Sequence, residues 1–199
     1  MLEQLDKQLF LYLNSFNSPF WDRAMSIISG IATWIPLYLV IMAMLAVKYR
    51  KKFFILLIFI IIAVTLSDQL SVLIKNIVLR LRPCYEPSLE GLVHNVNGRC
   101  GGKYSFVSSH ATNSFNVAVL SLLLIRKRWF SAGIILWAAV VGYSRIYLGV
   151  HYPGDVLGGA SLGMLIGWSV YNMYYRADRY LVRRNKYLSA KKSNSNAPE

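Results

Sequence analysis

Charged residues are scarce in this chain of 199 residues, and acidic residues are the scarcest. Asp, Glu, Lys and Arg make up 16% of the sequence, whereas soluble domains contain about 25%. The chain has 9 Asp and Glu against 22 Lys and Arg. Hydrophobic residues account for 55%, and the mean hydropathy is +0.40. This composition excludes an intrinsically disordered chain and argues against an ordinary soluble globular domain.

Long apolar stretches are what the chain has instead. Five of them carry almost no charge, with Asp68 and Arg145 as the only interruptions: residues 24–47, 53–74, 106–125, 129–150 and 156–175. A helix needs about 20 mainly apolar residues to cross the hydrocarbon core of a bilayer. The stretches are too continuous for the alternating strands of a membrane barrel. They therefore predict five transmembrane helices.

The N-terminal residues have a different pattern. Apolar side chains recur there every three or four residues, with polar residues between them: Leu2, Leu5, Leu9, Leu13 and Phe16. This periodicity predicts an amphipathic helix that lies in the membrane interface. A sixth helix packed within the bundle is the alternative. A signal peptide is not expected, because the segment opens with Glu3 and lacks a basic start. The predicted fold is an all-α integral membrane bundle of six helices.

The basic residues indicate an orientation. They cluster between the first two predicted spans, between the third and fourth, and after the fifth: residues 48–52, 126–128 and 176–192. Basic loops favour the cytoplasmic side. The N-terminus, the 76–107 loop and the 145–155 turn then face outward, and the net charge of +13 reflects topology rather than nucleic-acid binding. We expect one membrane domain over 1–184 and a flexible cytoplasmic tail over 185–199.

Three clusters of polar residues fall at the outward ends of the predicted spans. They are K-N-I-V-L-R-L-R-P from Lys75, V-S-S-H from Val107, and S-R-I-Y-L-G-V-H-Y-P-G-D from Ser144. Lys75, Arg82 and Arg145 supply three cations without matching acids, which favours an anion. Ser108 adds a hydroxyl, and the start of a helix around it adds backbone N–H groups. Together these groups predict a phosphate site.

Two histidines complete this predicted site. His151 precedes Asp155 by four residues, and a carboxylate on one imidazole nitrogen leaves the other free to attack. His110 suits a general acid for the leaving oxygen. Taken singly, these residues have ordinary alternatives, such as a core histidine, a loop histidine, or Asp155 as a helix cap. For Arg80 we expect a membrane-interface anchor. No carboxylate cluster in the sequence suggests a metal site.

The motifs K-x6-R-P, S-x-H and S-R-x5-H-x3-D resemble those of type 2 phosphatidic acid phosphatases, a family within the vanadium haloperoxidase superfamily. The resemblance implies a helical membrane enzyme of bacterial type with no metal or other cofactor. It implies that His151 is a nucleophile forming a phosphohistidine, that Asp155 orients it and that His110 is the general acid. The implied phosphate-binding groups are those of Lys75, Arg82, Ser108, Arg145 and the backbone N–H of Ser109.

The second motif departs from the family's usual P-S-G-H. Val107 replaces the proline and Ser109 replaces the glycine. The Ser109 side chain can narrow the approach to the site, which affects specificity more than chemistry. Asp68 lies two helical turns before Lys75, and we expect it to support Lys75 or Arg82 from behind. A polar residue facing the bundle interior is the alternative.

Cys84 and Cys100 are the only cysteines, and both fall in the predicted outward loop. That side of a bacterial inner membrane is oxidising, so we hypothesise a disulfide. Closing a loop of about 15 residues stabilises by about 3 kcal/mol in the chain-entropy model. Two free thiols are the alternative.

The sequence therefore predicts a multi-pass enzyme of the bacterial inner membrane that dephosphorylates a lipid phosphate or diphosphate at its periplasmic face. Undecaprenyl diphosphate, phosphatidylglycerophosphate, phosphatidic acid and the phosphates of lipid A all fit, and the sequence does not choose among them. The expected partners are the lipid substrate and the bilayer, without nucleic acid, and the oligomeric state is left open. The alternatives are a lipid phosphotransferase that uses the same intermediate and a non-catalytic lipid-phosphate binder or transporter.

Overall fold

The computed structural model describes the backbone of residues 1–195 and the side chains of residues 1–184. This part of the chain is helical, without a strand, which confirms the predicted all-α class. The helices are α1 (Leu2–Asn14), α2 (Pro19–Ser29), α3 (Ile35–Tyr49), α4 (Phe53–Val78), α5 (Ser109–Ile125), α6 (Arg128–Tyr147) and α7 (Pro153–Ser195). Short 3-10 turns lie at Ile31–Trp34, Arg50–Lys52, Pro83–Tyr85, Pro87–Leu89 and Val96–Gly98.

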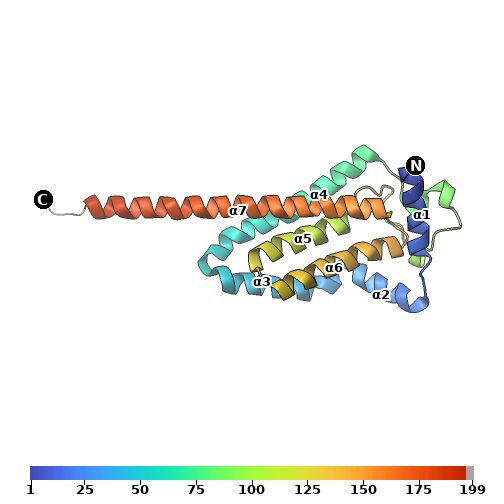
Figure 1. Cartoon of the computed structure of the whole chain (residues 1–199), viewed down its shortest axis with the longest axis horizontal. Helices are drawn as coiled ribbons and strands as arrows, with labels where there is room; N and C mark the ends of the chain where they lie inside the picture. Colours follow the sequence, from blue (N-terminus) through green and yellow to red (C-terminus); the bar gives the residue numbers. More distant parts are fainter. Residues whose placement is uncertain (196–199) are drawn as a thin grey trace.

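The helices α3 to α7 form an elongated bundle, and α1 lies across one end of it (Figure 1). The helix α5 is the centre of the bundle, with more than half of its side chains buried. The long α4–α5 connection and the α6–α7 turn meet at the end that α1 covers. The helix α7 has 43 residues, which corresponds to about 65 Å, and it projects beyond the opposite end.

Glycines of α7 allow α5 to approach closely. A Cβ atom added at Gly159 would lie 2.5 Å from the Ser108 carbonyl oxygen, and one at Gly163 would lie 2.2 Å from the Thr112 carbonyl oxygen. Neither distance leaves room for a side chain. The repeat of small residues every fourth position in the sequence therefore serves packing within the bundle.

The first predicted span, 24–47, is not one helix. It is divided into α2 and α3 because Gly30 adopts an extended conformation after α2 and a proline opens α3. The side chains of Thr33 and Trp34 donate hydrogen bonds to the carbonyls of Ile27 and Ile28, at 2.6 and 2.7 Å. These bonds satisfy backbone groups that the break leaves free.

The N-terminal helix α1 is amphipathic, but its apolar residues divide between two environments. Phe10 is fully buried against Tyr152, with ring centroids 5.4 Å apart. Leu5 and Leu9 are about half exposed on the outer side. Asn14 fixes the end of the helix, because its side-chain amide donates to the carbonyl of Tyr147 at 2.8 Å. The helix thus lies on the bundle end rather than inside it, as the interfacial prediction requires.

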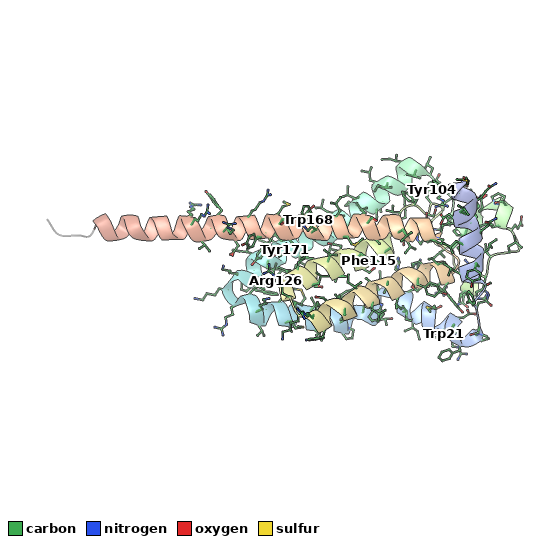
Figure 2. All side chains as sticks on the ribbon, in the orientation of Figure 1. Trp21, Tyr104, Phe115, Arg126, Trp168 and Tyr171 are labelled. Atoms are coloured by element: carbon green, nitrogen blue, oxygen red, sulfur yellow. A yellow bond between two sulfur atoms is a disulfide. The ribbon has the colours of Figure 1, made fainter. Side chains whose placement is uncertain are left out.

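Large apolar side chains cover the outside of the bundle. On α4, Phe54 is 74% exposed and Ile58 is 58% exposed, and Trp21 and Trp168 lie on the outer surface in Figure 2. Such a surface fits lipid rather than water. Two helical stretches, Ile31–Val78 and Arg128–Tyr147, are long and apolar enough to cross a membrane, and α5 is a shorter apolar helix.

The helix α7 passes the expected boundary between the membrane domain and the tail. It continues without a break from residue 184 to Ser195. No glycine or proline interrupts this part of the sequence, so nothing in it stops the helix. Residues 196–199 lie outside the described part of the chain.

Candidate active site

His151 lies in the turn between α6 and α7 and is 1% exposed. Its backbone N–H donates to the carbonyl of Arg145 at 3.3 Å, which holds the two residues on one side of the turn. Its Nδ1 atom is 3.5 Å from Oδ2 of Asp155 in the first turn of α7. This distance exceeds a normal hydrogen bond. The carboxylate therefore lies beside the imidazole, and the pair can tighten when substrate binds.

Asp155 is fixed by other groups. Its Oδ2 atom accepts from the backbone N–H of Tyr152 at 2.8 Å, and Oδ1 accepts from the guanidinium of Arg80 at 2.9 Å. The second branch of that guanidinium donates to Asp6 of α1 at 2.8 Å. Asp6 also accepts from the backbone N–H of Gly154 at 2.8 Å. Both oxygens of the buried carboxylate thus have a partner besides the imidazole.

Arg80 is consequently not the interface anchor that the sequence suggests. Its guanidinium lies 4.0 Å from the centre of the Tyr152 ring and bridges the two carboxylates of Asp6 and Asp155. A planar, forked cation suits this double contact. The prediction failed because Asp6 is distant in sequence and no local pattern links it to Arg80.

Lys75 lies in the last turn of α4, beside the start of α5. Its ammonium donates to the Ser109 hydroxyl at 2.5 Å, and that hydroxyl is 2.7 Å from the Ser71 hydroxyl. The sequence predicts that the backbone N–H of Ser109 binds phosphate. In the structure its side chain, in addition, accepts a hydrogen bond from Lys75. The residue that replaces the family's usual glycine holds the lysine. Ser71, one turn before Lys75 on α4, was not singled out by the sequence motifs.

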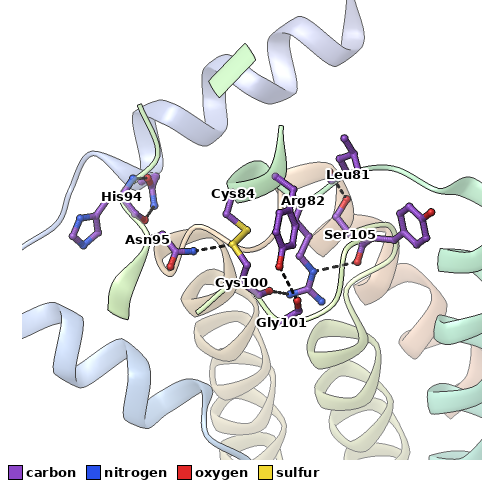
Figure 3. The surroundings of a disulfide bond; sticks show 11 residues. Leu81, Arg82, Cys84, His94, Asn95, Cys100, Gly101 and Ser105 are labelled. Carbon is purple, nitrogen blue, oxygen red and sulfur yellow. Dashed lines mark hydrogen bonds between the residues drawn. A yellow bond between two sulfur atoms is a disulfide. The ribbon is translucent and has the colours of Figure 1, made fainter. Parts of the chain in front are cut away.

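Arg82 lies in the α4–α5 connection beside a disulfide (Figure 3). Its guanidinium donates to the carbonyl of Cys100 at 2.6 Å, and its Nε to the carbonyl of Tyr104 at 3.2 Å. Cys100 is joined to Cys84, with the two Cα atoms 6.2 Å apart. The bridge closes the loop of residues 84–100, and the carbonyl of Cys100 at its end accepts from Arg82.

Arg145 extends from the last turn of α6 toward α2. Its Nη1 atom donates to the Ser29 hydroxyl, and its Nε atom is buried without a hydrogen-bond partner in the described residues. Arginine has five N–H donors, so this guanidinium keeps capacity for an anion.

Ser108 and His110 open α5. Ser108 caps the helix with its hydroxyl, and its backbone N–H donates to the Asp155 carbonyl at 3.0 Å. His110 follows in the first turn and borders a cavity of about 150 Å³ together with Ser109 and Asp68. Asp68 makes no ion pair with Lys75 or Arg82 within the described residues. Its expected support of those cations is therefore not a direct contact, and it shares the cavity with His110 instead.

The charges at this end of the bundle converge on His151. Burial, together with the positive charges of Arg82, Arg145 and Lys75, lowers the pKa of His151 well below its ordinary value. The lowered pKa favours the neutral imidazole at neutral pH, and a neutral imidazole has a lone pair free to act as a nucleophile. The three sequence clusters, separated by up to 80 residues, meet around one buried site. The described residues contain no group of three or more His, Cys, Asp or Glu that is placed to hold a metal ion.

Comparison with known proteins agrees with this geometry. Residues 52–179 match the model of the PAP2 superfamily. The chain is 42% identical over 173 residues to the lipid A 4'-phosphatase of Bacteroides thetaiotaomicron, which covers 85% of this chain and 77% of that protein.

Two crystal structures have the same fold. One is a transmembrane PAP2-type phosphatidylglycerolphosphate phosphatase from Bacillus subtilis, with a TM-score of 0.68 and 25% identity over 88% of this chain and 87% of that one. The other is LpxE of Aquifex aeolicus, with a TM-score of 0.66 and 26% identity over 83% and 93%. The chain belongs to the PAP2 superfamily, which confirms the resemblance that its motifs carry and the predicted phosphatase class.

Proposed function

We propose that the protein removes phosphate from a membrane lipid through a covalent phosphohistidine on His151. The observation that carries this proposal is the buried His151 imidazole beside a fixed carboxylate, with three cations near enough to lower its pKa. The cations bind and neutralise a phosphoryl group, which is the main requirement of phosphoryl transfer. The relatives that are phosphatases of lipid A favour a phosphorylated acylated glycolipid as the substrate.

The first step forms a bond from Nε2 of His151 to phosphorus and breaks the bond from phosphorus to the lipid oxygen. Asp155 stabilises the imidazolium through the Nδ1 side, which lies 3.5 Å away. His110 gives its proton to the leaving lipid oxygen. Asp68 lines the same cavity as His110.

The second step returns the enzyme to its starting state. A water molecule attacks phosphorus and gives a proton to His110, the bond from phosphorus to Nε2 breaks, and inorganic phosphate leaves. We place the site at the outer face of a bacterial inner membrane, with the C-terminus in the cytoplasm. The support for this orientation is the basic turn between α3 and α4 at the opposite end of the bundle.

Trapping the intermediate tests this mechanism. We expect His110→Gln to accumulate phosphoprotein from a phosphate ester with a good leaving group, because such an ester needs no acid in the first step whereas hydrolysis still needs His110. The double variant His110→Gln, His151→Gln is the matched control and should hold no phosphate. Phosphoprotein in the double variant would exclude His151 as the nucleophile.

Two further measurements separate the alternatives. If phosphate released equals lipid consumed, the enzyme is a hydrolase rather than a phosphotransferase. Turnover that persists in EDTA is expected for chemistry carried by Lys75, Arg82 and Arg145, and complete loss in EDTA that added metal restores would contradict it.

A further inference from the structure

The position of His110 shows where the leaving group lies. The general acid must reach the oxygen that connects phosphorus to the lipid, so the lipid extends from the phosphate on the side of His110. The cavity of about 150 Å³ beside His110 is on that side. This step rests on the proposed function.

A larger apolar cavity adjoins that cavity. The second cavity has a volume of about 450 Å³, lies between α3, α4 and α5, and shares Ile31, Tyr38 and Asn113 with the first. Its walls are mostly aliphatic side chains such as Ile41 and Leu124. A volume of this size is typical of a small-molecule site. The two cavities are therefore neighbours, the smaller one beside His110 and the larger one among the helices of the bundle.

Two polar atoms without partners in the described part of the chain belong to residues that line the smaller cavity. Asn113, one turn after His110, has a buried side-chain oxygen that accepts no hydrogen bond from the described residues. Trp137 of α6 borders the smaller cavity and is 8% exposed. Its indole N–H is likewise buried and donates to none of the described residues. An unpaired buried polar group costs about 1–3 kcal/mol of folding free energy. A ligand that supplies the missing hydrogen-bond partners explains both residues better.

We infer that Asn113 and Trp137, which we call the throat, bind the polar linkage between the phosphate-bearing headgroup and the acyl chain of the substrate. The indole N–H donates to an acyl carbonyl. The Asn113 oxygen accepts from a hydroxyl or an amide N–H. The hydrocarbon chain then continues into the apolar cavity.

The throat therefore selects acylated lipid phosphates over polyprenyl phosphates. A polyprenyl chain begins directly at its phosphate and offers neither a carbonyl nor a donor, so it leaves both protein groups unpaired. Sites built around hydrogen bonds reject analogues that lack the partner. The wide groove beside α1 does not offer this contact, because it borders Asp6 and Arg80 behind the Asp155 carboxylate rather than His110.

A pair of lipids that differ by one carbonyl tests the Trp137 contact. The probes are a diacylglycerol phosphate with two ester-linked chains and its analogue in which one ester is replaced by an ether, in the same detergent, scored by phosphate release. We expect the wild type to prefer the ester about fivefold to tenfold in kcat/KM, the range for one hydrogen bond. In Trp137→Phe the preference should vanish, while packing of the ring against Trp34 is kept. Equal rates on both lipids in the wild type would overturn the inference.

A second pair of lipids tests Asn113. The probes are two lipid phosphates that differ only in whether the acyl chain is attached through an amide or an ester. We expect the wild type to prefer the amide about fivefold, and Asn113→Leu should lose this preference. The matched control is Ser121→Ala in the larger cavity, because that hydroxyl is already satisfied by the carbonyl of Ala118 at 3.1 Å. Ser121→Ala should keep both preferences.

The wild-type comparisons decide the matter even if a variant fails to fold. A polyprenyl phosphate hydrolysed as fast as the acylated lipids would also contradict the inference while leaving the proposed function intact. Phosphate release from none of the lipids, including a phosphorylated acylated disaccharide, would instead contradict the proposed function.

Discussion

Arg80 connects three parts of the protein at a single residue. Its guanidinium holds Asp155 of α7 and Asp6 of α1 and stacks on Tyr152. An orienting carboxylate is useful only if it is itself held, and Asp155 cannot rely on solvent because it is fully buried. Arg80 thus positions the carboxylate that lies 3.5 Å from the His151 imidazole, the nucleophile in the proposed mechanism.

The change Arg80→Lys tests this role. A single ammonium cannot bridge both carboxylates in the geometry of a guanidinium, so Asp155 should shift relative to His151. We expect kcat to fall about 100-fold, the cost of a misplacement of about 1 Å, while KM stays within about twofold. Arg99→Lys, at an exposed position of the same connection, is the control and should leave both constants unchanged. A rise in KM alone would show that Arg80 binds substrate instead.

Ser109 holds Lys75, although the family's usual motif has glycine at this position. In Ser109→Ala the ammonium loses a hydrogen bond of 2.5 Å. Hydrogen bonds to charged groups contribute about 1.5–3 kcal/mol, so kcat/KM should fall at least about tenfold. Ser131→Ala, whose hydroxyl bonds only to its own helix, controls for the loss of a serine. Unchanged kcat/KM in Ser109→Ala would remove this role.

His151 should be neutral below pH 6.5. Burial and the nearby cations Arg82 and Arg145 lower its pKa, so the unfolded chain takes up a proton that the folded chain does not. The free energy of unfolding should therefore decrease as the pH falls below about 6.5. Nitrogen NMR of the three histidines reads the charge directly, with His151→Gln assigning the signal. A His151 imidazole that titrates at or above pH 6.5 would contradict this expectation.

At the scale of elements, the α4–α5 connection forms much of the site. It carries Arg80, Arg82 and Ser105, and the Ser105 backbone N–H donates to the Arg80 carbonyl at 2.8 Å. Lys7 of α1 adds an ion pair to Glu86 of this connection at 3.1 Å. Hydrogen bonding from Ser88 and Lys7 lowers the pKa of Glu86. The connection is therefore held both by a hydrogen bond within itself and by an ion pair to α1, although it is mostly irregular.

The disulfide should matter for Arg82 more than for the bundle. In unreduced protein, Cys84 and Cys100 should resist thiol labelling, and reductant should expose both. Reduction should raise KM several-fold, because the Cys100 carbonyl that orients Arg82 is released, while the helical content stays the same. The variant Cys84→Ser, Cys100→Ser should be insensitive to reductant. Complete labelling before reduction would exclude the bridge.

The sequence predicted those features that a long apolar run or a motif marks clearly. It missed a helix break inside an apolar run and contacts between residues distant in the chain. Apolar runs were sufficient to predict the bundle, and three motifs were sufficient to predict that the segments of Lys75, His110 and His151 lie together. The break near Gly30 was missed because the residues on either side of it are equally apolar. The contacts of Asp6 were missed because they join α1 to residues more than 70 positions away, which no local periodicity encodes.

At the scale of the whole molecule, the two ends of the bundle differ in charge and task. One end holds the site. The other holds the basic turn, where Lys48 donates to the carbonyls of Leu124 and Ile125 at the end of α5, at 2.7 and 3.0 Å. Lys52 pairs with Asp178 of α7 at 2.8 Å. The basic residues thus cap helices in addition to setting the proposed orientation.

Accessibility in intact cells tests that orientation. In a background without native cysteines, Glu90→Cys on the site side should react with a maleimide that cannot cross the inner membrane. Lys127→Cys, in the α5–α6 turn at the opposite end, should react only after lysis. The reverse pattern would place the site in the cytoplasm.

The contact between α5 and α7 has a consequence for how the enzyme can change over generations. Ser108 and Asp155 belong to these two helices, and the missing side chains at Gly159 and Gly163 set the separation between them. Even a methyl group there would push the two backbones apart and strain the hydrogen bond of 3.0 Å from the Ser108 N–H to the Asp155 carbonyl. Substitutions that adapt the enzyme to new lipids are thus constrained at these glycines and less constrained in the cavity walls farther from them.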